Sequence, residues 1–236
     1  MSIFSFHLAK TTFATTAKAL LRPPAAERVP GLHRAECMAA MGLGTPILSS
    51  ARMQVRTLAV FAWWKSARAI DDFLAQTELG RTLALGWHVR MEFVRQWGRV
   101  TEFADLPPSA GELAPTDPVV AVTLARLKLT ELSRFIRWGK PVEELVRDHP
   151  GTTLALAAMR PPHTFSTFSV WRTQREMLDM VRGRDTFAGG ERHAAAMIER
   201  KRKDFHHEFT TLRFRALEER GTWEGRSEIV PKGGVG

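Results

Sequence analysis

Two distant stretches of the chain resemble each other. Residues 61–72 read FAWWKSARAIDD, and residues 168–179 read FSVWRTQREMLD. Six matched positions lie 107 residues apart: Phe61 and Phe168, Trp64 and Trp171, Lys65 and Arg172, Arg68 and Arg175, Ile70 and Met177, Asp72 and Asp179. Any one match could be chance, but their shared spacing predicts an internal duplication.

Further matches flank this stretch in the same order. Pro30-Gly31 recurs as Pro150-Gly151, and Ala39-Ala40-Met41 recurs as Ala157-Ala158-Met159. Arg90 and Gly98 recur as Arg213 and Gly221, now 123 residues apart. The second copy therefore carries about sixteen extra residues (123 − 107) before its last strand.

Both halves predict the same order of elements. In the first half we expect strands at 3–8, 35–41, 55–64 and 89–94, with helices at 11–21 and 66–85. In the second half we expect strands at 119–125, 154–159, 164–171 and 209–217, with helices at 130–146 and 173–205, the latter broken near Gly189-Gly190. The order β-α-β-β-α-β is that of a ferredoxin-like unit. The expected fold class is α+β: two tandem ferredoxin-like repeats whose antiparallel sheets pack face to face as an α+β barrel.

The expected domain organisation follows from the repeat. Residues 1–100 form the first repeat, the proline-rich residues 101–118 a linker, residues 119–225 the second repeat, and residues 226–236 a flexible tail. A ferredoxin-like sheet carries helices on one face only. We therefore expect the two bare faces to meet around an apolar chamber that suits a flat or elongated ligand.

Composition excludes several classes of protein. The chain has 236 residues, of which 44% are hydrophobic and 25% charged, which is typical of a globular protein. No run of eighteen apolar residues predicts an integral membrane span. The net charge of +9 is spread along the chain without a nucleic-acid motif, so no nucleic-acid partner is expected. The single Cys37 excludes an internal disulfide framework, and we expect a cytoplasmic protein.

The N-terminal segment has two interpretations. Residues 1–30 are rich in Ser, Thr and Ala and have their first acid at Glu27, a composition that mimics a transit peptide. The alternative is a strand at residues 3–8 followed by a helix. The repeat favours the alternative, because the second half has a matching first strand.

Familiar catalytic patterns are absent from the sequence. The eight histidines include no HExxH pair and no facial triad with a carboxylate, and there is no G-x-S-x-G elbow or phosphate loop. Cys37 lies in an apolar strand context that predicts an inert thiol. The run Arg200 to Lys203 predicts the solvated end of a helix.

His193 is the most informative histidine. It lies at the margin of the apolar stripe of its helix, beside Met197. Such a residue can offer a ring nitrogen to a haem iron. It can equally be a helix-edge histidine without a special partner, which the residues alone favour.

A family resemblance adds to this interpretation. Thr167-Phe168-Ser169-Val170-Trp171 resembles the TFS-aliphatic-Trp signature of spheroidene monooxygenase and its relatives, the first part of a pattern that continues downstream. The rest of the pattern is matched by His193, Met197, Phe205, Glu208, Arg213-Phe214 and Gly221-Thr222-Trp223-Glu224-Gly225, and upstream by Arg22-Pro23-Pro24 and Val29-Pro30-Gly31-Leu32. The resemblance runs from about Ser2 to Gly225 and is most specific in the C-terminal third.

The resemblance implies a tandem dimeric α+β barrel of the antibiotic-biosynthesis-monooxygenase type. It also implies a haem b cofactor, with His193 as the axial ligand of the haem iron. Aldoxime dehydratases and chlorite dismutases, related barrels that bind haem, likewise use a His on a helix beside the sheet, which is an analogy of fold. Two departures suggest a changed substrate. A Lys typical of the family is absent from residues 38–41, and Thr164-Phe165 replaces an Arg-Gln pair.

We therefore expect a haem-containing, monooxygenase-like oxidoreductase that acts on a small lipophilic molecule, such as a polyene or another secondary metabolite. His163, Ser169 and Arg213 are the candidates for orienting or reacting with the substrate. An electron donor and a second copy of the chain are the partners considered. The alternatives are a haem-dependent dehydratase or isomerase acting on an N–O substrate, a cofactor-free oxygenase, and a non-catalytic binder of haem or of a lipophile.

Overall fold

The computed structural model describes residues 3–46, 49, 52–184 and 190–232. The first half contains β1 (Ile3–Lys10), α1 (Phe13–Leu21), β2 (Leu32–Met41), β3 (Met53–Trp64), α2 (Ala67–Gln76), α3 (Glu78–Ala84) and β4 (Trp87–Arg99). The second half contains β5 (Val119–Leu127), α4 (Leu132–Asp148), β6 (Thr152–Arg160), β7 (Thr164–Trp171), α5 (Gln174–Arg182), α6 (Gly190–Arg202) and β8 (His206–Arg220). Two short 3-10 helices, η1 (Thr101–Phe103) and η2 (Leu129–Glu131), lie in the connections around β5.

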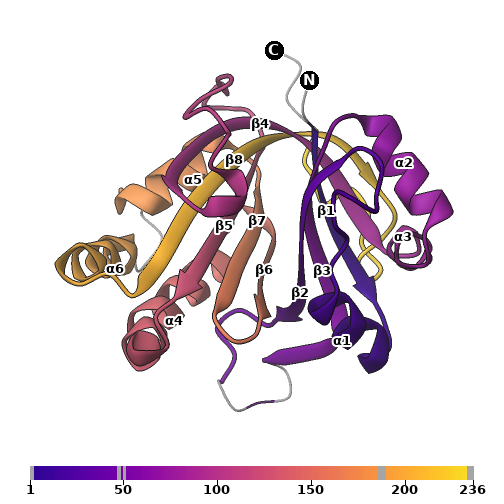
Figure 1. The fold of residues 1–236 in the computed structure, drawn as a ribbon. Helices are drawn as coiled ribbons and strands as arrows, with labels where there is room; N and C mark the ends of the chain where they lie inside the picture. Colours follow the sequence, from indigo (N-terminus) through magenta and orange to yellow (C-terminus); the bar gives the residue numbers. More distant parts are fainter. Residues whose placement is uncertain (1–2, 47–48, 50–51, 185–189, 233–236) are drawn as a thin grey trace.

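The strands of these residues close into one barrel in the order β1-β3-β2-β6-β7-β5-β8-β4. Within each half the last strand lies beside the first and the third beside the second, which is the ferredoxin-like arrangement. The two sheets join at both edges, through antiparallel pairs β2 with β6 and β4 with β8. The predicted fold class is thereby confirmed, and the face-to-face sheets are one continuous wall (Figure 1).

The interior of the barrel is filled with side chains. Alternate residues of each strand point inward, and the inward positions carry large apolar groups such as Phe4, Phe6 and Phe214, all fully buried. Phe6 from the first half stacks on Phe168 from the second, with ring centroids 3.7 Å apart. The expectation of a ligand chamber between the two sheets is therefore wrong, because this space is the main hydrophobic core.

A buried ionic cluster joins the two halves inside the barrel wall. The carboxylate of Glu36 on β2 accepts a hydrogen bond from Arg160 Nε on β6 at 2.6 Å, and Arg126 Nη2 on β5 lies 3.2 Å from the other oxygen of Glu36. Arg126 also pairs with Glu102 of η1. The deeply buried charges of Glu36 and Arg126 are tolerated because each has partners of opposite sign, and their other partners, Arg160 and Glu102, are partly exposed.

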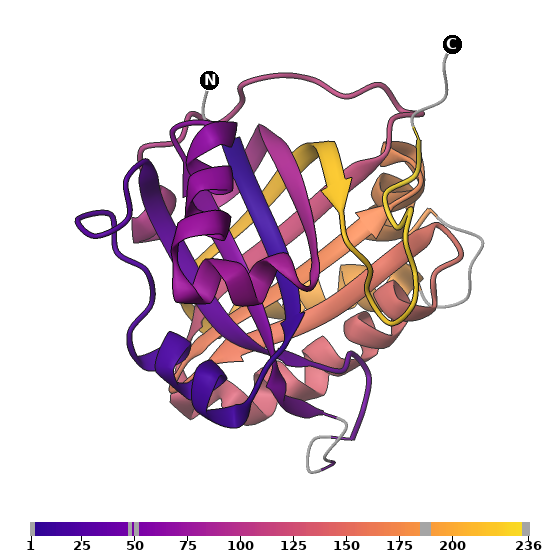
Figure 2. The ribbon, with the colours of Figure 1, turned by 90° about the vertical axis from the view of Figure 1, so that its right-hand side faces the viewer.

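The helices lie on the outside of the barrel, one set on each half. Figure 1 shows α1, α2 and α3 on one side and α4, α5 and α6 on the other. Figure 2 shows α2 and α3 in front of the strands of the first half. There the packing is close: Trp64 on β3 meets Phe73 on α2, with ring centroids 5.2 Å apart.

Three segments differ from the expected elements. The helix expected at 66–85 is split at Thr77, whose hydroxyl accepts from Gly80 N and starts α3. The helix expected at 173–205 is divided into α5 and α6, but α5 already ends at Gly183, which adopts a positive φ of 65°. Of the two glycines at which the break was expected, Gly190 begins α6 and Gly189 lies outside the described residues. Part of the expected flexible tail packs on the barrel: Ile229 is buried, and its N–H donates to the carboxylate of Glu219 at 2.9 Å.

Candidate functional site

A cavity of about 690 Å³ lies on the outer face of the second-half sheet, under α4, α5 and α6. The sheet contributes small and hydroxyl-bearing side chains, among them Ala121, Thr123 and Thr211, while α4 contributes the aromatic rings of Phe135 and Trp138. Pockets that hold drug-sized ligands or cofactors have volumes of roughly 300–1,000 Å³. The cavity is therefore large enough for such a molecule.

The duplication explains why the first half has no equivalent space at this point. Ile3 pairs with Trp64 and Val119 pairs with Trp171, so His7 occupies the position that Thr123 has in the second half. The 123-residue offset likewise relates His88 to Thr211. His7 and His88 lie opposite each other and stack with ring centroids 4.9 Å apart. The two buried imidazole rings of the first half thus fill the volume that Thr123 and Thr211 leave open in the second half.

His193 lines the cavity from α6. Its Nδ1 atom is buried and has no hydrogen-bond partner within the described part of the chain, whereas the ring hydrogen-bonds the main chain at Val181 of α5. Burial lowers the pKa of His193 below its ordinary value. The imidazole is therefore neutral near pH 7, with one nitrogen that no group of the described residues satisfies.

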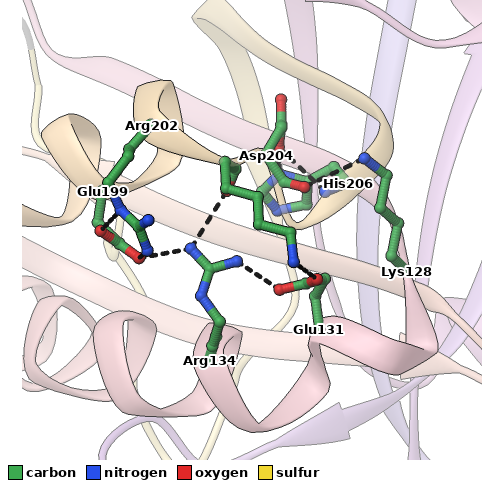
Figure 3. A network of polar contacts seen from close by, with 8 residues as sticks. Lys128, Glu131, Arg134, Glu199, Arg202, Asp204 and His206 are labelled. Carbon is green, nitrogen blue, oxygen red and sulfur yellow. Dashed lines mark hydrogen bonds and ion pairs between the residues drawn. The ribbon is translucent and has the colours of Figure 1, made fainter.

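Ion pairs fix the C-terminal end of α6 against α4 (Figure 3). Glu199 accepts hydrogen bonds from Arg134 of α4 at 2.5 Å and from Arg202 at 2.7 Å. Lys203 lies 2.5 Å from Glu131, which also pairs with Arg134. These hydrogen bonds from Arg202 and Arg134 lower the pKa of Glu199 to about 2. The helix that carries His193 is thus anchored by a charged network at its far end.

Ser169 and Arg213 both line the same cavity, from β7 and β8. The hydroxyl oxygen of Ser169 accepts a hydrogen bond from Trp171 Nε1 at 2.9 Å, which leaves the hydroxyl hydrogen available as a donor. Arg213 lies over the ring of Trp97 at 4.1 Å, and its Nε atom is buried without a partner among the described residues. Burial, together with the nearby charges of Arg95 and Arg182, lowers the pKa of Arg213 to about 10.

His163 lies apart from these residues. It is in the turn between β6 and β7, where its carbonyl oxygen accepts from Leu127 N at 2.8 Å, and it does not line the cavity. Three of the four sequence-predicted site residues are therefore brought together, and His163 is not. Sequence reasoning missed the wall formed by α4 and the neighbouring Arg95 and Trp97 of β4. The 123-residue offset, which relates Arg213 to Arg90 on β4, could have pointed to the strand that carries Arg95 and Trp97.

Other features limit the chemistry of the chain. Within the ranges that the structure covers, no three His, Cys, Asp or Glu side chains group together as ligands for a metal ion. Cys37 is fully buried, and burial raises the pKa of its thiol to about 12. None of the helices in the described ranges combines the length and apolar character needed to cross a membrane.

The closed barrel and its sheet-to-helix cavity define a dimeric α+β barrel protein in which two ferredoxin-like repeats are fused in one chain. Comparison with solved structures agrees at the level of the fold. A crystal structure of an aldoxime dehydratase in complex with butyraldoxime aligns with a TM-score of 0.55 at 8% identity, over 92% of this chain and 79% of the dehydratase chain.

Sequence comparison gives a more particular similarity. Spheroidene monooxygenase of Rubrivivax gelatinosus is 31% identical over 170 residues, which are 71% of this chain and 63% of that protein. Spheroidene monooxygenase of Rhodobacter capsulatus is 28% identical over 137 residues, 58% of this chain and 54% of that protein. No family model matches the chain. These matches support the resemblance to spheroidene monooxygenase, and the chain spans 54% and 63% of the length of these two curated relatives.

Proposed function

We propose that this protein is a monooxygenase-like oxidoreductase that binds haem b in the cavity between the second-half sheet and its helices, with His193 as the axial ligand of the iron. The observation that carries this proposal is the Nδ1 of His193, which is buried without a partner among the described residues in the wall of a cavity of about 690 Å³. A neutral imidazole whose second nitrogen has no partner is chemically suited to bind iron.

The residues around His193 fit such a cofactor. The ring hydrogen-bonds the main chain at Val181, and histidines that bind metals commonly use one ring nitrogen in this way while the other binds the metal. Phe135, Trp138 and Met197 provide apolar surface for a flat macrocycle. The ion pairs at the end of α6 would hold the histidine in place when the cofactor enters.

Haem bound at this site would supply a redox-active iron for the activation of oxygen. The protein's own contribution would be binding and orientation. The apolar walls would exclude water, Ser169 would donate its hydroxyl hydrogen to a polar group of the ligand, and Arg213 would supply a fixed positive charge.

The substrate that we propose is a small lipophilic molecule. Both curated relatives bear the name of an enzyme acting on spheroidene. The missing Lys at residues 38–41 and the Thr164-Phe165 pair favour a different compound of similar apolar character. An electron donor and a homodimer are part of this proposal as partners that the reaction and the fold class would accommodate.

The test is an absorption spectrum of the full chain expressed with a haem precursor, recorded before and after reduction and addition of carbon monoxide. We expect one haem per chain and a Soret band that shifts on reduction. The variant His193→Ala should lose most of its haem, whereas the control His207→Ala, which removes an exposed histidine of β8, should retain it.

Three results would contradict the proposal. Unchanged haem content and spectrum in His193→Ala would remove His193 as the ligand. A colourless protein that oxygenates a lipophilic substrate would instead identify a cofactor-free oxygenase, and binding of haem or of a lipophile without turnover would identify a non-catalytic binder.

A further inference from the structure

The duplication provides an internal comparison for the cavity residue Arg213. Arg90 and Arg213 are equivalent by the 123-residue offset. The strand pairing respects the same relationship: Arg90 on β4 lies opposite Glu218 on β8, and Arg213 on β8 lies opposite Arg95 on β4. Since 218 − 95 is also 123, the same pair of positions occurs twice around the barrel, once in each half.

In the first half this arginine is neutralised. Arg90 is buried, and its Nη2 lies 2.5 Å from Oδ1 of Asp71 on α2, while its Nε lies 3.4 Å from Oε2 of Glu218. Two carboxylates from two different elements thus balance one buried guanidinium. The local charge is satisfied within the protein itself.

In the second half both acids have been replaced. The 107-residue offset that relates the helices puts Leu178 at the position of Asp71, and the 123-residue offset puts Arg95 at the position of Glu218. Among the described residues, the charges that act on Arg213 are those of Arg95 and Arg182 and not of a carboxylate, and its Nε is buried without a partner. Leu178, Arg95 and Arg213 all line the cavity.

The result is a concentration of positive charge on one part of the cavity wall. Arg95 and Arg213 lie over the same ring, that of Trp97, at 5.1 and 4.1 Å. Arg182 at the end of α5 adds a third guanidinium that lines the cavity. Arg95 and Arg182 are exposed, but Arg213 is partly buried, and a partly buried charge beside like charges is unfavourable for the folded protein alone. A bound anion would remove this cost and would gain charge-assisted hydrogen bonds.

We propose that Arg213 and Arg95 form a carboxylate-binding site in the cavity wall, so that the ligand of this cavity is a largely apolar molecule bearing a carboxylate. The planar guanidinium matches a carboxylate with two parallel hydrogen bonds, which a point charge cannot do. This proposal deepens the proposed function, because it concerns the same cavity. The carboxylate belongs either to a propionate of the haem or to the lipophilic substrate.

Two pairs of probes distinguish these sources. The first pair is haem and its dimethyl ester, in which both propionates are masked, titrated into haem-free full-length protein and followed by the Soret band. The second pair is retinoic acid and retinol, two polyenes that differ in the carboxylate, followed by quenching of tryptophan fluorescence. Trp97, Trp138 and Trp171 line the cavity and report on its occupation.

Each titration is repeated with Arg213→Gln and with Arg215→Gln. Arg215 lies on the same strand and loses the same charge, but it is exposed and pairs with Glu92 at 2.9 Å. Circular dichroism verifies that both variants are folded. We expect the wild type to bind the acid of one probe pair at least about tenfold more tightly than its neutral partner, as one charge-assisted hydrogen bond allows. Arg213→Gln should abolish this preference and Arg215→Gln should preserve it.

The outcomes separate the proposals. A preference for haem over its ester identifies a propionate as the anion, and a preference for retinoic acid over retinol identifies the substrate. Absence of both preferences in the wild type, or a preference that survives in Arg213→Gln, overturns the carboxylate site. If haem binding depends on His193 but neither acid is preferred over its neutral partner, the proposed function is supported and the carboxylate site is not. A preference for retinoic acid in a protein that binds no haem would support the carboxylate site and contradict the proposed haem function.

Discussion

Glu36 on β2 accepts a hydrogen bond from Arg160 on β6 at 2.6 Å, across the seam where the two repeats meet. The carboxylate is 5% exposed and also faces Arg126, so its removal would leave a buried guanidinium without this partner. We expect Glu36→Ala to lower the free energy of unfolding by about 3 kcal/mol. Urea denaturation measures this. The control Glu92→Ala breaks the more exposed pair with Arg215 and should cost less than about 1 kcal/mol. Equal losses in the two variants would refute a special role for the seam.

Arg90 and Arg213 should respond oppositely to the same substitution. Arg90→Met leaves Asp71 and Glu218 without their cation, and because both acids are about half exposed we expect a loss of only about 2 kcal/mol. Arg213→Met removes an unpaired, partly buried charge and should be neutral or stabilising by about 1 kcal/mol in the ligand-free protein. Thermal unfolding of both variants checks the signs. A large loss of stability in Arg213→Met would mean that the protein itself supplies its counter-charge.

Acid should destabilise the first half through its buried histidines. Burial, with the charges of Arg90 and Arg220, lowers the pKa of His88 to about 4, and burial also holds the pKa of His7 well below its ordinary value. Between pH 6.5 and 4 the unfolded chain therefore binds protons that the folded chain does not, so stability falls as the pH falls through this window. For His88 alone the full loss is about 3 kcal/mol.

The variant His88→Gln isolates this effect. Unfolding free energies at pH 7 and pH 4.5 should differ less in His88→Gln than in the wild type, although carboxylates contribute to the acid response of both proteins. Identical pH dependence in the two would show that His88 is protonated without penalty.

The network at the end of α6 should control the local stability of that helix. Glu199→Gln weakens the bonds to Arg134 and Arg202, and we expect severalfold faster amide exchange over the second half of α6 at neutral pH. Because the folded pKa of Glu199 is lowered to about 2, the contribution of its charge is present above about pH 4.5 and is lost as the pH falls toward 2. Glu228→Gln, which breaks an exposed pair with Lys232, is the control. If exchange rates in α6 of Glu199→Gln match those of the wild type, the charged network does not stabilise this helix.

The fold was predictable because the duplication is visible in a few side chains that pack between the sheet and its helices. Trp64 and Trp171 each end the third strand of their repeat and pack under a helix, so both positions kept the same residue. The ends of the longer helices were less predictable. Their breaks depend on a cap at Thr77 and a left-handed Gly183, neither of which interrupts the apolar pattern.

The location of the cavity was not predictable from the same pattern. Strand β5 is apolar on both faces, with Val120 and Val122 facing the core and Val119 and Ala121 facing the helices. Which face retains space depends on the volumes of side chains contributed by distant strands, such as Phe6 and Phe168 on the inside. Ser169, His193 and Arg213 were proposed as site residues by family resemblance, and the structure brings them to one cavity, whereas His163 remains in a turn.

Because His7 and His88 fill the outer sheet face of one half only, the two halves of the barrel are unequal. Identical subunits related by a two-fold axis must carry identical sites, so a change that opens one face opens both. Two repeats fused in one chain are free of this constraint, and here His7 and His88 fill the position in the first half that Thr123 and Thr211 leave open in the second. The two halves of each chain are therefore not equivalent: at this position the first half presents a filled outer sheet face and the second half an open one.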